Sequence, residues 1–304
     1  MQPVIPTQLI PPMNRSKILF MRKKDRPLNP MADIFVRYLL GSQEHTNILI
    51  SFINAVFSHK GHDLVVEIEI LNPFNLKSLQ ETKESLLDVK AKDSSGRWIN
   101  IEIQVDNDGS YANRSLYYWA KSYSTQLNTG QNYGELSPSV CINLLDFKLF
   151  PQLSGYHSCF HITEVDDPEY ILSEHLQIHF IELPKNQLSN LDQIKTGLDA
   201  WCYYFENEGD LQEDDMTILL KNTPALGEAH KVYRNFTAND ELMDLAEARE
   251  KWLKDVNTRL HHAREEGMKQ ARIDDAKKMM KEGLEVAMIA RITGLSEKEI
   301  KELR

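Results

Sequence analysis

The stretch LLDVKAKDSSGRWINIEIQV, residues 86–105, decides the fold. Strand side chains alternate between two faces, and residues 99–105 divide in this way into an apolar set, Ile99, Ile101, Ile103 and Val105, and a polar set, Asn100, Glu102 and Gln104. Ser and Gly in the Asp93–Gly96 segment supply the chemistry of a short turn. The stretch therefore predicts an antiparallel hairpin, with a first strand over 86–92 and a second over 98–105.

The polar face of this hairpin brings two carboxylates together. If the turn is centred near Ser95, opposite residues have numbers that sum to about 190, so Asp88 faces Glu102. Directly opposed side chains have β-carbons about 4.5–5.5 Å apart, and two carboxylates at that separation repel unless a cation lies between them. Mg²⁺ is typically held by one or two carboxylates. The hairpin thus predicts a divalent cation site at Asp88 and Glu102, with Gln104 on the same face.

A second interpretation of the same residues stays open. Alternating polar residues most often form the solvent face of a hairpin, and Glu102 can then pair diagonally with Lys90. The pairing also depends on the register, because a shift of one residue would move the partner of Asp88 to the apolar face.

The sequence around the hairpin alternates between helical and strand periodicities. An apolar stripe from Ile48 to Phe57 predicts one buried helix face, and the continuous apolar run at 139–147 predicts a strand buried on both faces. The other predicted elements are strands at 64–70, 157–163 and 176–183 and helices at 111–127 and near 187–205. The order helix, three strands, helix, strand indicates an α/β core around one central sheet.

Charge and composition divide the chain into three parts. Residues 1–32 are basic, with a net charge of +5 and six prolines, and are predicted to be an extended arm. Residues 33–236 carry a net charge of -14 and are predicted to be the folded domain. Residues 237–304 carry -1 and are rich in Ala, Glu, Lys, Met and Leu, which is typical of long helices.

Several classes of protein are disfavoured by what the sequence lacks. No apolar run approaches the roughly 18 residues of a membrane helix, and no apolar signal region begins the chain, so we expect a cytoplasmic protein without a membrane partner. Nucleotide-binding, zinc-protease and serine-hydrolase motifs are missing. Cys141, Cys159 and Cys202 lie far apart without a CxxC pair, so they predict buried thiols and neither a disulfide framework nor a zinc knuckle.

Several strings together resemble the recombination-promoting nucleases (Rpn) and the PD-(D/E)XK nuclease family transposases. They are MADIFVRYLLG at 31–41, LLDVKAKD at 86–93, INIEIQ at 99–104, RSLYYWAKSY at 114–123, IHFIELPK at 178–185 and MIARITGLSEKEI at 288–300. The resemblance runs over most of the chain. It implies a restriction-endonuclease-like PD-(D/E)XK core, made of a helix, three strands, a helix and a strand, with a C-terminal helical tail.

The resemblance also implies roles for individual residues. Asp88 becomes the motif aspartate and Glu102 the motif glutamate, both ligands of Mg²⁺ or Mn²⁺, and Gln104 stands where the broader superfamily has lysine. Asp33 matches an early acidic position, where it completes the metal shell, orients a metal-bound water or caps its helix. The implied chemistry is hydrolysis of DNA phosphodiester bonds, with the metal neutralising phosphate charge and lowering the pKa of its bound water.

Three further residues are candidates for binding the substrate. Arg114 and Tyr118 are four apart and share a helix face, which suits a guanidinium that grips a phosphate. The alternative, an aromatic helix that packs on the sheet, accounts for most of the rings in this segment. Lys90 can supply the charge that Gln104 lacks, or it can be a solvated strand lysine.

The C-terminal residues 286–300 resemble a small helix–turn–helix, with Gly294 in the turn and Ser296 capping the next helix. Acidic residues cancel the basic ones on that last helix, which favours packing or self-association over base readout. The sequence therefore predicts a metal-dependent DNA endonuclease of low sequence specificity, associated with transposition or recombination. The competing hypothesis is a nuclease fold that has lost efficient catalysis and serves as a DNA-binding or assembly protein.

Overall fold

A computed structural model describes residues 28–75, 88–107, 109–188 and 190–303. The predicted basic arm therefore lies outside the described residues up to position 27, as do positions 86 and 87 of the predicted hairpin. The described end of the arm is part of the folded core, since Leu28 and Met31 are both buried.

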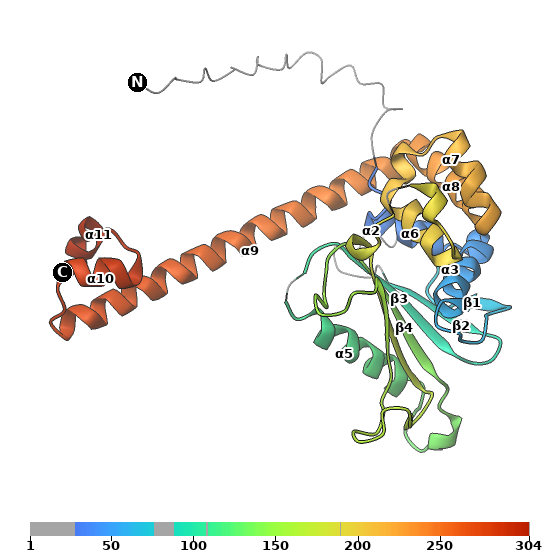
Figure 1. The fold of residues 1–304 in the computed structure, drawn as a ribbon, viewed down its shortest axis with the longest axis horizontal. Coiled ribbons are helices and arrows are strands. Elements are labelled where there is room, and N and C mark those ends of the chain that lie inside the picture. The colour runs from blue at the N-terminus through green and yellow to red at the C-terminus, as the bar shows by residue number, and fades with distance from the viewer. Residues whose placement is uncertain (1–27, 76–87, 108, 189, 304) are drawn as a thin grey trace, which may run out of the picture. The chain divides into compact units, whose positions relative to one another are not determined.

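Within the described residues, six strands form one sheet in the order β1-β2-β3-β4-β6-β5 (Figure 1). The strands are β1 (Ile68–Ile70), β2 (Val89–Asp93), β3 (Trp98–Gln104), β4 (Ser139–Leu145), β5 (His157–Phe160) and β6 (Leu176–Glu182). The helices of this part of the chain are α2 (Asp33–Gly41), α3 (Thr46–Ser58), α5 (Tyr111–Ser124), α6 (Gly197–Asn207), α7 (Glu213–Asn222) and α8 (Ala225–Ala238). The succession α3, β1, β2, β3, α5, β4 confirms the predicted order of helix, three strands, helix, strand.

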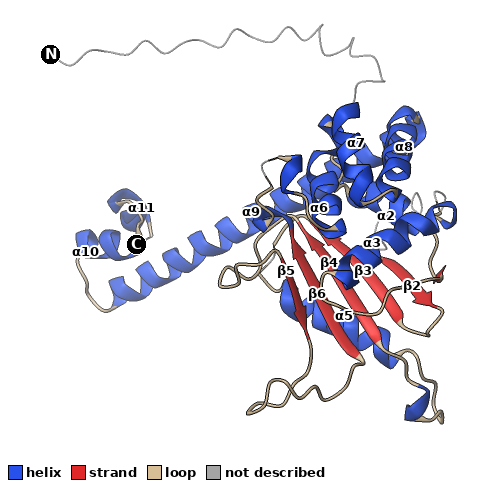
Figure 2. Cartoon of the chain, turned by 45° about the vertical axis from the view of Figure 1, so that its right-hand side comes forward, coloured by secondary structure: helices blue, strands red, loops and turns tan. Residues whose placement is uncertain are grey.

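The sheet has two differently covered faces. Helices α2, α3 and α6 gather on one face, and α5 lies against the other (Figures 1 and 2). Strand alternation assigns side chains to these faces, so Ile99 and Ile101 join the large core beneath α2 and α3. Cys141 and Phe180 join a smaller core with Tyr111 of α5. Neighbouring residues of one strand, such as Val140 and Cys141 of β4, therefore pack into the two different cores.

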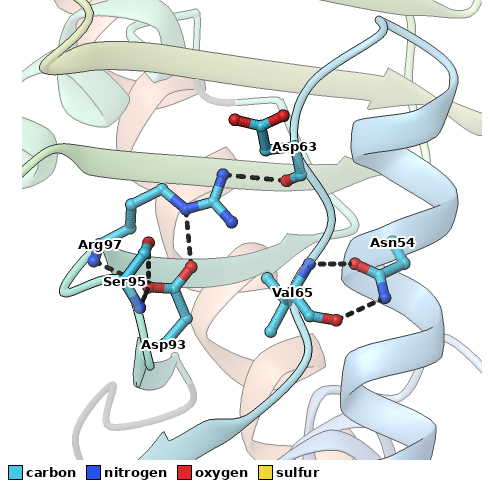
Figure 3. Close-up of polar contacts among 6 residues, drawn as sticks. All are labelled: Asn54, Asp63, Val65, Asp93, Ser95 and Arg97. Atoms are coloured by element: carbon cyan, nitrogen blue, oxygen red, sulfur yellow. Dashed lines mark hydrogen bonds and ion pairs between the residues drawn. The ribbon is translucent and has the colours of Figure 1, made fainter.

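The β2–β3 hairpin confirms the predicted register. Val89 pairs with Ile101 and Lys90 with Asn100, so paired numbers sum to 190. The turn is fixed by Asp93, whose carboxylate accepts hydrogen bonds from the backbone N–H groups of Ser95 and Arg97 and pairs with the Arg97 Nε at 2.6 Å (Figure 3). Gly96 has a φ of 93°, a conformation that favours glycine. The one-residue slip that would have separated the carboxylates does not occur.

Two of the predicted elements begin well after the expected residue. The strand predicted at 64–70 begins only at Ile68, because Val65 exchanges two hydrogen bonds with the Asn54 side chain and is held against α3 (Figure 3). The helix predicted near 187–205 begins at Gly197, after a capping box in which Thr196 and Asp199 satisfy each other's backbone N–H groups. Both differences arise from hydrogen bonds between side chains and backbone groups, which the spacing of apolar residues in the sequence does not reveal.

The chain divides into two compact units after Ala246. Helix α9 (Asp240–Lys281) spans the division, and its early residues Leu242 and Met243 are buried in the core of the first unit. The second unit has its own small core of Ala276, Ile289, Leu295 and Ile300. None of the helices in the described residues has the length and apolar character needed to cross a membrane.

The second unit ends in the predicted helix–turn–helix. Helix α10 (Val286–Thr293) ends at Gly294, which has a φ of 72°, and α11 (Glu297–Glu302) begins with Ser296 in a capping box with Glu299. A glycine in the left-handed region and a capped start are the usual ends of two helices joined by a tight turn. The predicted roles of Gly294 and Ser296 are confirmed.

Candidate functional site

The two predicted carboxylates lie at the same end of the hairpin. Asp88 directly precedes β2, and one further step along the ladder from the Val89–Ile101 pair brings it opposite Glu102 of β3. The charge of Asp88 acts on the Glu102 carboxyl group. The sequence therefore placed this pair correctly relative to each other, because the register follows from the turn.

Asn72 binds the backbone at Asp88 and Lys90, and Arg37 places a positive charge near Asp88. The Asn72 side chain donates to the Asp88 carbonyl at 3.0 Å and accepts from the Lys90 N–H at 2.7 Å. The Asn72 carbonyl in turn accepts a hydrogen bond from the Arg37 guanidinium. Arg37 is buried, and although burial lowers its pKa, the nearby Asp88 charge acts in the opposite direction. The charge of the buried Arg37 therefore acts on Asp88.

The pKa of the Glu102 carboxyl group is strongly perturbed. Burial, together with the charge of Asp88, raises the pKa of Glu102 to about 7. Arg114, a hydrogen bond from the Asn100 Nδ2 at 3.2 Å, and Lys90 act in the opposite direction. The net result is that the two carboxylates do not both carry charge easily without an added cation.

Helix α5 covers this face and presents Arg114 to the pair. The guanidinium carbon of Arg114 lies 5.4 Å from the centre of the Tyr118 ring and 5.9 Å from that of Tyr111, which are distances typical of cation–π contacts. The buried Arg114 Nε has no hydrogen-bond partner among the described residues. The structure thus brings Arg114 and Tyr118 together on one face, as their spacing predicts, with an unused donor near Glu102.

Buried amides connect this face to the interior of the sheet. The Tyr111 hydroxyl donates to the Asn143 Oδ1 at 3.0 Å, and the Asn143 Nδ2 donates to the His179 carbonyl at 2.9 Å. Asn143 pairs with Glu102 across the parallel β3–β4 ladder. This chain of bonds fixes the start of α5, and with it the approach of Arg114, relative to the strand that carries Glu102.

Gln104 and Lys90 contact other groups than Glu102. The Gln104 Nε2 donates to the Asp106 carbonyl at 3.0 Å, just beyond the end of β3. The Lys90 Nζ lies 3.2 Å from the Asp88 Oδ2, and the lysine side chain is 48% exposed. The diagonal pair between Lys90 and Glu102 is therefore replaced by a pair with Asp88, and the lysine remains half open to solvent.

Asp33 begins α2 but does not cap it. Ala32 occupies the N-cap position, and the Asp33 Oδ1 accepts a hydrogen bond from the N–H of Ile34 at 2.7 Å. The capping interpretation of Asp33 is therefore wrong by one position, although a negative charge in the first turn still favours the helix dipole. Its second interpretation, as part of a metal shell, remains a prediction.

Several residues of this site were missed by the sequence analysis: Arg37, Asn72, Asn100, Tyr111 and Asn143. Arg37 had a detectable signal, because it lies in MADIFVRYLLG four residues before Gly41. A β-carbon at position 41 would collide with the Arg37 guanidinium, so the glycine leaves space for the arginine. Asn100 was predicted to share the polar face with Glu102, but Asn72, in the loop after β1, and Asn143, in β4, gave no signal, since a single polar residue does not reveal its partner.

Comparison with known protein families identifies two family models that match this chain. A family model described as PD-(D/E)XK nuclease family transposase matches residues 30–263. A second model, described as Rpn/YhgA-like nuclease family, C-terminal HTH domain, matches residues 269–304. No curated protein and no solved structure matches the chain. The first match covers well over half of the sequence, and both matches agree with the resemblance carried by the motif strings.

Proposed function

Because the chain belongs to the PD-(D/E)XK nuclease family transposases, we propose that it is a metal-dependent DNA endonuclease that hydrolyses phosphodiester bonds with little sequence specificity. The observation that carries this proposal is the register of the β2–β3 hairpin, which sets Asp88 beside Glu102. The biological setting we propose is transposition or recombination.

The donor set at this position suits Mg²⁺ or Mn²⁺. Carboxylate oxygens are the ligands that these hard cations prefer, and Asp88 and Glu102 would supply them. Burial and the neighbouring Asp88 charge raise the pKa of Glu102, and a cation between the carboxylates would relieve the second of these effects. When bound, such a cation supplies charge neutralisation at the phosphate and acidifies a water molecule.

Arg114 is proposed to bind the phosphate that is cleaved. Its Nε has no partner among the described residues, and a guanidinium donates well to two phosphate oxygens at once. The contact with the Tyr118 ring orients the planar group. Tyr118 therefore acts as a positioning residue, and its hydroxyl is not needed for this role.

Lys90 is proposed to take over part of the task of the missing lysine. Gln104 supplies hydrogen bonds but no charge, and its amide already donates to the Asp106 carbonyl. Lys90 lies beside Asp88 with half of its side chain exposed, so its ammonium group can reach an incoming phosphate. Asp33 is retained as a proposed participant in the metal shell.

The experiment is Mg²⁺-dependent nicking of supercoiled plasmid by the purified full-length protein. Asp88→Ala and Glu102→Ala should each abolish nicking, while Glu69→Ala, which removes an exposed carboxylate from the neighbouring strand, should leave it unchanged. Nicking by either site variant at the wild-type rate would contradict the assignment. The far-ultraviolet circular dichroism of each variant establishes that the fold is intact.

The alternative function, a nuclease fold that binds or assembles on DNA without cutting it, is favoured by one observation, Gln104 at the lysine position. The C-terminal helix–turn–helix match gives such a protein a second means of contacting DNA. DNA retention in an electrophoretic mobility assay without cleavage in Mg²⁺ or Mn²⁺ would favour this alternative. For the C-terminal helices we keep self-association as the proposal, since α11 alternates acidic and basic residues.

A further inference from the structure

The face of the sheet opposite Asp88 and Glu102 carries a cluster of nitrogen and sulfur donors near its other edge. Its members are His59, His62, His157, Cys159, His161 and His179. In the HSCFH segment at 157–161, alternation places His157, Cys159 and His161 on one side of β5 and its extension. Cys159 is paired directly with His179 across the β5–β6 ladder.

Three imidazole nitrogens surround the Cys159 sulfur. The Cys159 Sγ lies 3.4 Å from the Nε2 of His161, 3.7 Å from that of His179 and 3.8 Å from that of His62. In a tetrahedral site with Zn–S of about 2.3 Å and Zn–N of about 2.0–2.1 Å, ligand sulfur and nitrogen atoms are about 3.5–3.6 Å apart. The ligand atoms of His62, Cys159 and His161 lie within 4.8 Å of one another. The His179 Nε2 lies close to the sulfur but outside this group of three.

We propose that His62, Cys159 and His161 bind one Zn²⁺ ion and that His179, whose Nε2 lies 3.7 Å from the sulfur, completes the tetrahedron. A thiolate with three imidazoles is a donor set that selects zinc among the common biological cations, and it is poorly suited to Mg²⁺. Four protein ligands leave no open position for a substrate, so the ion has a structural role. It joins the loop after α3, the edge strand β5 and its inner neighbour β6.

The hydrogen bonds behind His179 support its role as a ligand through Nε2. The His179 Nδ1 lies 3.0 Å from the His157 Nε2, and the His157 Nδ1 lies 3.0 Å from the His59 Nδ1. If the His179 Nε2 ligates the metal, its Nδ1 carries the proton and donates to His157, which in turn donates to His59. Metal-bound histidines usually donate their second N–H in this way.

The loop that carries His62 is held in place from both sides. On one side, Asn54 of α3 exchanges hydrogen bonds of 2.8 and 2.7 Å with the backbone of Val65. On the other side, the Arg97 Nη1 donates to the Asp63 carbonyl at 2.9 Å (Figure 3). The position of His62 is therefore fixed by contacts that do not involve the proposed metal, so this ligand is positioned before the ion binds.

The test uses full-length protein that carries Asp88→Ala and Glu102→Ala, so that the carboxylate site cannot contribute metal. We expect one equivalent of Zn²⁺ to bind in competition with a chromophoric chelator. Replacement by Co²⁺ should give a thiolate-to-cobalt charge-transfer band and the intense visible bands of tetrahedral coordination. Cys159→Ala in the same background should abolish the charge-transfer band and weaken zinc binding at least tenfold, while Cys202→Ala, which removes a buried thiol elsewhere, should retain both.

The possible outcomes distinguish a zinc site from a histidine cluster that binds no metal. Failure of the folded parent protein to bind one equivalent of Zn²⁺, or a Co²⁺ complex without the charge-transfer band, would overturn the site. Equal zinc affinity in the Cys159→Ala protein would overturn it as well. If Cys159→Ala does not fold, His161→Ala and the exposed control His261→Ala take its place, and the cobalt spectrum of the parent protein still decides the question.

Discussion

The two faces of one sheet carry the two proposed metal sites, whose donor atoms have opposite character. The carboxylate site under α5 offers oxygen donors from Asp88 and Glu102, which are separated by one hairpin turn in the sequence. The histidine–cysteine cluster on the other face offers nitrogen and sulfur donors from three separate segments, around positions 62, 159 and 179. Hard oxygen donors suit Mg²⁺ and soft sulfur donors suit Zn²⁺, so the two proposed sites would hold different metals on opposite faces of the sheet.

This difference also decides which site the sequence could reveal. The carboxylate pair follows from strand alternation and one turn, because both determine the register. The cluster depends on β5 pairing with β6 and on the loop after α3 reaching the same position, and no local pattern encodes these long-range contacts. The HxCxH spacing at 157–161 was the available signal, since alternate residues of a strand share a face.

The largest expected effects come from one variant in each site. Each variant should lose the function of its own site and keep that of the other. Glu102→Ala should reduce Mg²⁺-dependent nicking by at least about 10³-fold, because a catalytic metal supplies several kcal/mol and about 1.4 kcal/mol corresponds to tenfold. The same protein should keep the cobalt–thiolate band. Cys159→Ala should lose the band and, once folded, nick DNA with Mg²⁺ at close to the wild-type rate.

Chelation provides the control for this pair of variants. Brief EDTA treatment followed by Mg²⁺ alone should restore nicking fully only if the folded state survives without zinc. Because the zinc-free Cys159→Ala protein is expected to nick at close to the wild-type rate, addition of Zn²⁺ before Mg²⁺ should restore no more activity than Mg²⁺ alone in either protein. A gain from Zn²⁺ in wild type alone would mean that the cluster supports the carboxylate face.

Arg114→Ala tests whether α5 contributes to the carboxylate site or only covers it. Loss of one charged donor at a phosphate should lower nicking about 10²-fold, and Arg114→Lys should recover part of this loss because it restores charge without the planar fork. Lys121→Ala removes an exposed cation from the same helix and serves as the control. A merely structural role would lower thermal stability in Arg114→Ala without this graded recovery by lysine.

His157→Ala tests the second layer of the histidine–cysteine cluster. Removal of a residue that orients a metal ligand commonly lowers metal affinity about 10- to 100-fold, so zinc affinity should fall in this range while the cobalt–thiolate band persists. Nicking in saturating Zn²⁺ and Mg²⁺ should remain unchanged. If zinc affinity equals that of the wild type, His179 is not oriented through His157.

Asp93 contributes to both regions, because its turn joins β2 to β3 and positions Arg97 against the His62 loop (Figure 3). Burial alone would raise the pKa of Asp93, but hydrogen bonds from Ser95 and Arg97 lower it below 3.8. We expect Asp93→Asn to reduce the free energy of unfolding by about 2 kcal/mol near neutral pH, as for a hydrogen-bonded buried charge.

The sign of the pH dependence follows from the direction of this shift. A carboxyl group with a lowered folded-state pKa stabilises the protein above its ordinary pKa of 3.8, and this contribution is lost as the pH falls through the lowered value. The difference between wild type and Asp93→Asn in urea unfolding should therefore be constant near pH 7 and shrink below about pH 4. Asp63→Asn, which keeps the carbonyl bound by Arg97, is the control and should show no such difference.

The sequence predicted the order of elements and the carboxylate pair because both depend on local periodicity and one turn. It did not predict Arg37 near Asp88, since a helix and a strand far apart in the sequence bring these charges together. The motif strings also include residues with structural roles. Glu182 of IHFIELPK is fully buried, accepts hydrogen bonds from the N–H groups of Leu149 and Phe150, and pairs with the Lys185 Nζ at 2.6 Å.

The smallest expected effect concerns Gln104, the position at which this chain departs from the superfamily. Gln104→Lys would place a positive charge on the polar face of β3, two residues from Glu102, and would release the hydrogen bond to the Asp106 carbonyl. If the fold retains catalytic geometry, the added charge should increase Mg²⁺-dependent nicking about tenfold, equivalent to about 1.4 kcal/mol.

Gln104→Met is the matched control, because it has a similar length, makes no such hydrogen bond and carries no charge. It should not increase nicking, so a gain in both variants would point to release of the end of β3 and not to charge. Gln104→Lys with unchanged nicking, in a protein whose Glu102→Ala variant is inactive, would mean that Lys90 already supplies the required cation beside Asp88. Lys90→Ala should then abolish nicking in the wild type and be rescued by Gln104→Lys.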